Sequence, residues 1–303
     1  MKERKQQVIE KAHRLFIDKG YQATSIQDIL DASAISKGTF YNYFPSKSEL
    51  FKAVFTSIRN KHEEGRNELL IGEDLANIEI FIKQIDLVME SNKRNQLFTL
   101  IEEAFASNDP DLKKFVKRAQ ILLIQWINQR FIDLFGEDKR PYLLDCAILF
   151  LGMLQQTTNF HYTAKGPNTH QLEIIRYCVE RLKVIVNDVS KTGIQLLPPE
   201  LLKSWLPETT DSDTSFVNDL LHKSSDFKKM IVQTLKKEPE RMKYLQTLDF
   251  IQEELLNNKT PRTFLIESSL LSLKMCPELQ GTEELREFQM LVTSHLQRIA
   301  KPV

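Results

Sequence analysis

The side chains best suited to binding chemistry lie together near the N-terminus, in residues 36–44, SKGTFYNYF. This segment is predicted to be one short helix that begins after the N-cap Ser36 and is stopped by Pro45. At about 100° per residue, Phe40 and Phe44 share the side that faces a small core. The outward side carries no carboxylate and consists of Gly38, Thr39, Tyr41 and Asn42. Such a surface can enter the major groove of DNA. The segment alone is equally consistent with a turn of helix that carries incidental surface tyrosines.

Two more helices are predicted to position this segment. Val8 and Phe16 belong to a helical pattern of apolar residues that ends at Gly20, a residue suited to the position after a helix. A second helix is predicted to start at Ser25, with Asp28 completing a capping box that has a shorter acid than usual. Two predicted helices, separated by a turn, therefore precede the aromatic segment.

Composition predicts a globular, all-α fold. Of 303 residues, 42% are hydrophobic and 27% charged, with 9 Gly and 11 Pro, and long stretches lack both of these helix-disfavouring residues. No alternating strand pattern occurs. The N-terminus is charged, and no apolar run approaches the roughly 18 residues of a membrane span. We therefore expect a cytoplasmic protein that does not enter a membrane.

The chemistry of a metal site or an enzyme is not evident. His161 and His170 lack the spacing of metal ligands, and no HExxH motif, nucleophile elbow or Gly-rich phosphate loop occurs. Cys146, Cys178 and Cys276 lie too far apart for a CxxC zinc site and are odd in number. Buried packing thiols are the simpler interpretation, with redox sensing as the alternative. We expect no catalytic residue, no metal and no cofactor.

Charge and helix spacing divide the chain. Residues 1–61 hold 11 Lys and Arg against 6 Asp and Glu, a net charge of +5 that suits contact with phosphate. Residues 192–215, rich in Pro and polar side chains, are predicted to be a connection. Helices are predicted at 46–70, 74–90, 93–106, 108–135, 141–161 and 170–190 before it, and at 216–222, 225–237, 239–257, 261–275 and 282–300 after it.

From Thr24 to Phe51 the residues resemble the TetR family of bacterial transcription regulators. The matching positions are Thr24, Ser25, Asp28, Ile29, Ser36, Gly38, Thr39, Tyr41, Tyr43, Phe44 and Lys47. The resemblance covers about the first fifty-five residues at motif level and the chain to about residue 190 only in its helical layout. The sequence departs from the family at Ser33-Ala34, where Ala-Gly is usual, at Leu30, where Ala is usual, and at Tyr43, where His is commonest. If Ala34 keeps the positive φ of that glycine, the cost should be about 1 kcal/mol.

The resemblance implies roles for the residues of the first domain. Those expected near base edges are Gln27, Lys37, Gly38 and Asn42. Those expected to hold phosphates, together with the cap residue Ser36, are Thr24, Ser25, Thr39, Tyr41, Tyr43 and Lys47. Phosphate contacts position a protein on DNA without reading its sequence. Lys47 also starts the long fourth helix, whose movement in the family couples ligand binding to DNA binding.

The resemblance further implies a homodimeric repressor of a palindromic operator, released by an apolar or amphipathic inducer. We expect a helix-turn-helix domain at 1–52, a ligand-binding and dimerisation domain at 53–191, and a C-terminal helical extension at 192–303. The paired helices at 141–161 and 170–190 would form the dimer. The candidate pocket residues, each of which is alternatively ordinary core, are Phe98, Phe105, Trp126, Phe131, Phe150, Gln155, Asn159 and Phe160. A second interpretation is a regulator or helical interaction protein whose extension binds a protein partner, without small-molecule control.

Overall fold

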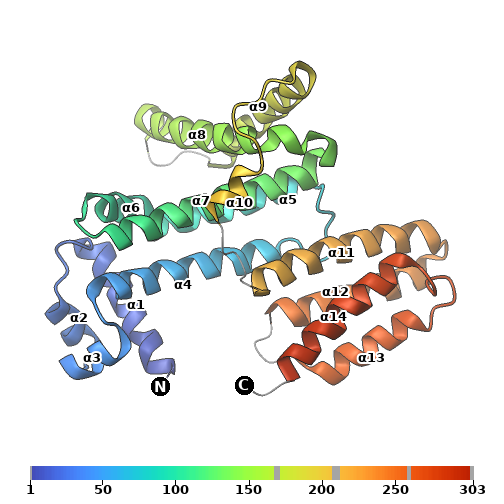
Figure 1. Ribbon diagram of the computed structural model, residues 1–303, viewed down its shortest axis with the longest axis horizontal. Helices are drawn as coiled ribbons and strands as arrows, with labels where there is room; N and C mark the ends of the chain where they lie inside the picture. The colour runs from blue at the N-terminus through green and yellow to red at the C-terminus, as the bar shows by residue number, and fades with distance from the viewer. Residues whose placement is uncertain (1, 167–170, 207–211, 258–260, 301–303) are drawn as a thin grey trace. The chain divides into compact units, whose positions relative to one another are not determined.

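A computed structural model describes residues 2–166, 171–206, 212–257 and 261–300, and within these ranges the regular structure is helical throughout (Figure 1). The predicted all-α fold is confirmed. No helix in the described ranges is long and apolar enough to cross a membrane. The same ranges contain no group of three or more His, Cys, Asp or Glu side chains that could hold a metal ion.

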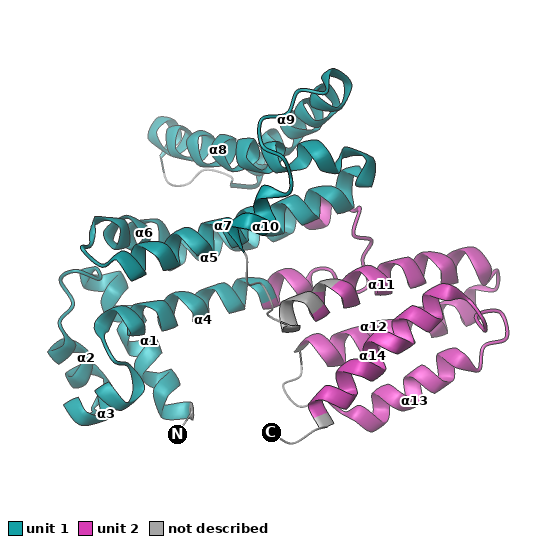
Figure 2. Ribbon diagram, viewed as in Figure 1, with its two compact units in different colours: residues 1–63, 82–206 teal, residues 64–81, 207–303 magenta. Residues whose placement is uncertain are grey.

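The chain divides into two compact units (Figure 2). Unit 1 contains residues 1–63 and 82–206, and unit 2 contains residues 64–81 and 207–303. These units differ from the division expected from sequence, because residues 64–81 group with the C-terminal helices rather than with the middle of the chain. The three-domain division therefore stays a prediction.

The first four helices of the chain form a small N-terminal head. Their bounds are Lys2–Lys19 (α1), Ile26–Ser33 (α2), Lys37–Tyr43 (α3) and Lys47–Glu68 (α4). The core of the head contains Phe16, Ile29, Phe40, Phe44 and Leu50, all of them buried. Gly20 follows α1 at φ 83° and its N–H donates to the Phe16 carbonyl at 3.0 Å, so the predicted end of the first helix is confirmed.

The rest of unit 1 is a succession of helices that pack on their neighbours in the chain. Their bounds are Ile78–Arg94 (α5), Leu97–Ala106 (α6), Pro110–Phe135 (α7), Arg140–Lys165 (α8), Gln171–Thr192 (α9) and Leu201–Trp205 (α10), with a 3₁₀ turn at Glu137–Lys139. Helix α7 packs on α6 and α8, and α8 packs on α9. Asp109 caps α7 by accepting from the N–H groups of Asp111 and Leu112, each at 3.0 Å.

All three cysteines are free and buried, as the packing interpretation requires. Cys146 lies in α8 and Cys178 in α9, the two helices that pack together. Burial, followed by the nearby Asp145 carboxylate, raises the pKa of the Cys146 thiol to about 11. A thiol with that pKa carries little thiolate near neutral pH, which argues against a redox-sensing role for Cys146.

Unit 2 contains four long helices. Their bounds are Ser212–Thr234 (α11), Glu238–Asn257 (α12), Thr263–Lys274 (α13) and Glu283–Ala300 (α14). The core is formed by residues that include Phe227, Ile251, Ile266 and Phe288. Two separate helices were predicted, at 216–222 and 225–237, and this is wrong, because the single helix α11 runs without a break from Ser212 to Thr234. No Gly or Pro interrupts it, and the serines at its centre, Ser224 and Ser225, are buried.

Candidate nucleic-acid interface

Two N-terminal caps fix the start of α2 and the start of α3. The Ser25 hydroxyl accepts from the Asp28 N–H at 3.0 Å while the Asp28 carboxylate accepts from the Ser25 N–H at 2.8 Å. This is the predicted capping box. Ser36 caps α3 by accepting from the Thr39 N–H at 3.1 Å. Hydrogen bonds from Lys19 and then from Ser25 hold the pKa of the Asp28 carboxyl well below its ordinary value, so the cap is charged near neutral pH.

The outward face of α3 has the residues that the helical periodicity predicted. Phe40 and Phe44 are buried against the head core. The exposed residues of this face and its flank are Lys37, Gly38, Tyr41 and Asn42, with Thr39 and Tyr43 half-buried. Helix α3 has no acidic residue in its first turn, and the Tyr41 ring packs edge-on against Phe40 with centroids 5.3 Å apart. That contact restricts the orientation of an exposed aromatic side chain on the face that would meet DNA.

The turn between α2 and α3 depends on a strained alanine. Ala34 has φ 52° and ψ 47°, the left-handed conformation, and its N–H reaches back to the Asp31 and Leu30 carbonyls. The next N–H, of Ile35, donates to the Leu30 carbonyl at 3.2 Å. These bonds close α2 in the manner of a glycine C-cap. The prediction that Ala34 keeps the positive φ is confirmed.

Replacing Ala34 with glycine should increase the free energy of unfolding of the head by about 1 kcal/mol, because glycine adopts the left-handed conformation without a Cβ clash. Hydrogen exchange of the α2 and α3 amides measures this change. Ala32→Gly is the matched control, since Ala32 is exposed within α2, and there glycine should destabilise by about 0.5–1 kcal/mol. Equal effects of the two substitutions would contradict the assigned strain.

Thr24 and Ser25 are less available to DNA than the sequence suggested. Thr24 is buried, and its hydroxyl donates to the Gly20 carbonyl at 2.7 Å. Its expected role in holding phosphate is therefore corrected: the hydroxyl joins the end of α1 to the start of α2. The Ser25 hydroxyl is exposed but bonded to Asp28 at 2.6 Å. The Gln27 amide, also exposed, donates to Asp31 at 2.8 Å and could exchange that bond for a base edge.

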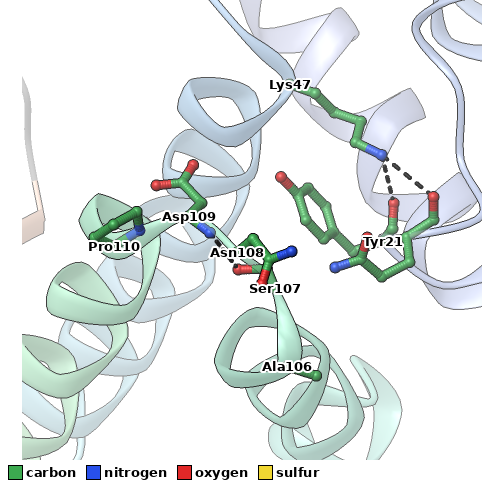
Figure 3. Close-up of a pocket in the computed structure, with 8 residues that line it drawn as sticks. Tyr21, Lys47, Ala106, Ser107, Asn108, Asp109 and Pro110 are labelled. Carbon is green, nitrogen blue, oxygen red and sulfur yellow. Dashed lines mark hydrogen bonds between the residues drawn. The ribbon is translucent and has the colours of Figure 1, made fainter.

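Lys47 serves the interior of the head. Its ammonium donates to the carbonyls of Thr24 at 2.8 Å, Tyr21 at 2.9 Å and Gln22 at 3.4 Å, and it lies 4.6 Å from the centre of the Tyr21 ring (Figure 3). Burial lowers the pKa of Lys47, and the Glu103 carboxylate opposes that shift. In this arrangement Lys47 ties the start of α4 to the α1–α2 turn. A phosphate contact by Lys47 stays a prediction that would require some of these bonds to break.

Helix α6 reaches the same turn. The Glu103 carboxylate accepts from the Gln22 N–H at 3.0 Å, and the Glu103 carbonyl accepts from the Gln22 amide at 3.4 Å. The positive φ of Gly20 favours glycine there, and a Cβ would displace the end of the Glu103 side chain, whose nearest oxygen would lie 2.5 Å away. Sequence reasoning missed Glu103, because the two partners are 81 residues apart and no local pattern joins them.

A shallow, open concavity of about 660 Å³ lies beside this contact. Its lining, drawn in Figure 3, consists of Tyr21, Gln22, Lys47 and residues 106–110. Burial, with a smaller contribution from Asp109, raises the pKa of the Tyr21 phenol, so it stays a neutral hydrogen-bonding group. The concavity shares no residue with the pocket that the sequence predicted.

Comparison with known proteins places this geometry in a family. The family of bacterial regulatory proteins named tetR matches residues 8–54, which span the three helices of the head and the start of α4. The head is a helix-turn-helix domain of the TetR type, the DNA-binding part of a transcriptional regulator.

Relatives of this regulator extend the likeness beyond the head. The uncharacterized HTH-type transcriptional regulator YerO of Bacillus subtilis (strain 168) is 26% identical over 279 residues, which are 90% of each chain. The uncharacterized HTH-type transcriptional regulator YuxN of the same organism is 27% identical over 165 residues, 51% of this chain and 54% of YuxN. No solved structure matches the chain. The match with YerO shows that the C-terminal region, which the family motif does not cover, is shared with another regulator.

The regulator's predicted pocket residues do not gather around one interior space. Phe131 and Phe150 are fully buried and pack edge-on with centroids 5.6 Å apart. Five others are exposed, namely Phe98, Phe105, Gln155, Asn159 and Phe160. Their expected place inside the middle block is corrected, because α8 turns only one stripe toward the core and residues 155, 159 and 160 lie off that stripe. Trp126 is half-buried.

A buried polar network, missed in the sequence, lies between α5 and α7 of the regulator. Arg130 donates to the Gln84 amide oxygen at 3.1 Å and to the Asp133 carboxylate at 2.6 Å. All three side chains are almost completely buried. Asn128 is buried nearby in α7, and its Oδ1 has no hydrogen-bond partner within the described ranges. Arginine is rarely buried without a structural reason, but its position inside the core could not be read from helix periodicity.

Proposed function

We propose that this regulator acts as a homodimeric repressor of a palindromic operator and that a small apolar or amphipathic molecule releases it from DNA. The observation that carries the proposal is the outward face of α3, which presents Lys37, Gly38, Tyr41 and Asn42 without a carboxylate. That face suits the major groove, and the head carries excess positive charge. Repression is the commoner mode of regulation in the family, so we propose a repressor rather than an activator.

Dimerisation through α8 and α9 is supported by apolar side chains that no neighbour covers. Leu149 and Phe160 are 11 residues apart on α8 and therefore lie on one face, with half-buried Met153 between them. Tyr177 and Val184 are seven residues apart on α9 and are also exposed. Exposed apolar side chains on two packed helices are typical of a protein interface. Pairing these faces would place two heads on the two half-sites of an operator.

Ligand control is supported by the unpartnered Asn128 oxygen in the core of unit 1. A buried polar atom normally has a partner, and a bound molecule can supply one. Asn128 lies in α7 among buried apolar residues of the same helix that include Ile127 and Phe131, so we expect an inducer that is largely apolar with one hydrogen-bond donor.

The test is binding of the full chain to DNA from upstream of its own gene, measured by fluorescence anisotropy at increasing salt. We expect specific binding that falls steeply with salt, since each neutralised phosphate contributes about −0.9 to the slope of log K against log salt. Apolar compounds that release this DNA would then identify the inducer class. Binding that is equally weak to shuffled DNA, at every salt concentration, would contradict an operator in this region.

A further inference from the structure

The outward face of α13 in unit 2 is an apolar stripe that is exposed among the residues that the structure describes. Ile266, Leu270 and Leu273 bury the opposite face against the core of the unit. The outward face carries Phe264, Ser268, Leu271 and the C-cap Met275, at spacings of four, three and four residues. Phe264, Leu271 and Met275 are 75%, 57% and 69% exposed. These spacings are those of the seam of a two-stranded coiled coil.

The charges beside this stripe have a pattern that points to one kind of partner. Within the described ranges α13 has one acidic and one basic side chain, Glu267 and Lys274, and both are exposed. They are seven residues apart and so lie on the same flank of the stripe. Neither side chain has an ion-pair partner among the residues that the structure describes. This flank therefore carries one negative and one positive charge that are both available for ion pairs with a partner.

We propose that α13 packs antiparallel against α13 of a second copy of this chain. A two-fold axis perpendicular to the helices brings the same flank of each helix together, so Glu267 of each copy faces Lys274 of the other. The two pairs are equivalent and leave no charge unmatched. A parallel pairing would instead set Glu267 against the uncharged Ser272 on the other flank.

The apolar layers of the antiparallel pair are also complementary. Phe264 of one copy lies opposite Met275 of the other, an aromatic–sulfur contact that occurs twice. In the two central layers, Ser268 of one copy faces Leu271 of the other, so a small residue meets a large one. Each copy thereby covers the exposed apolar side chains on the outward face of α13 in the other. This surface is separate from the α8–α9 face, and the proposal does not rest on the proposed function.

Charge reversal of the full-length chain tests the pairing by sedimentation equilibrium. Glu267→Lys makes both flanking pairs Lys–Lys, and Lys274→Glu makes both Glu–Glu. Each substitution should weaken the self-association about tenfold, as the loss of two exposed ion pairs and the gain of two repulsions require. An equimolar mixture of the two variants should regain wild-type affinity, because every contact between unlike chains is then Lys–Glu. The double variant should also regain it.

The matched control is Lys237→Glu, the same charge change at an exposed position outside α13, which should leave the association constant unchanged. The series is repeated with Val184→Glu, which removes any α8–α9 association and leaves α13 as the surface under test. Failure of the mixed variants to associate better than either alone would overturn the antiparallel pairing. A wild-type association constant in every variant would also overturn it. The stripe would then be expected to bind a different protein or unit 1 of the same chain.

Discussion

Lys37→Ala and Tyr41→Ala are each expected to weaken binding to the specific operator by about thirtyfold or more. A contact to a base edge or a phosphate contributes about 1–3 kcal/mol, and each dimer would lose two. Both side chains are exposed on the outward side of α3, and neither belongs to the buried core of the head. The fold should therefore survive both substitutions. Binding constants from anisotropy titrations at several salt concentrations measure the effect.

The salt dependence of DNA binding distinguishes the role of Lys37 from that of Tyr41. Losing Lys37 from both heads removes two positive charges, so the slope of log K against log salt should decrease by about two. Losing the neutral Tyr41 should lower the affinity at every salt concentration without changing the slope. Lys61→Ala is the control, because Lys61 is an exposed lysine well along α4 and carries the same charge as Lys37. Wild-type affinity in both α3 variants would exclude the assigned recognition surface.

Arg130→Met is expected to lower the free energy of unfolding of unit 1 by about 3–5 kcal/mol. Methionine fills much of the same space, but it removes the 2.6 Å ion pair that Arg130 makes with the Asp133 carboxylate, which is 4% exposed. A buried charge that loses its partner keeps the cost of desolvation without the compensating attraction. Both tryptophans, Trp126 and Trp205, lie in unit 1, so tryptophan fluorescence during urea denaturation reports on this unit.

Two further variants identify the cause. Arg130→Met combined with Asp133→Asn should be markedly more stable than Arg130→Met alone, because no uncompensated charge remains buried. Lys183→Met removes an ion pair with Glu180 at the surface, whose side chains are 42% and 59% exposed, and should change stability by less than about 1 kcal/mol. If the double variant is no more stable than the single one, packing rather than charge explains the loss.

The sequence by itself determined the head. Its caps at Ser25 and Ser36, its helix end at Gly20 and the outward face of α3 all depend on residues within four positions of one another. Hydrogen bonds at helix ends and the periodicity of side chains act over this range, so a linear pattern records them. The same locality explains why the family motif could be found in the first fifty-five residues.

Tertiary structure decided which polar groups are free to bind. Thr24 and Lys47 fit the motif, but contacts with Gly20, Tyr21 and Gln22 commit their polar atoms to the interior of the head. The contact between Glu103 and Gln22 has no local signature, since its residues lie 81 positions apart.

The same distinction holds for the middle of the chain and for unit 2. An apolar residue on a helix such as Phe160 can face a core or a partner, and periodicity alone cannot choose between them. The grouping of residues 64–81 with the C-terminal helices likewise follows from the packing of Leu70, Leu75 and Ile80 against Leu221. Contacts between distant segments depend on how whole helices pack, which is why only the tertiary structure could decide them.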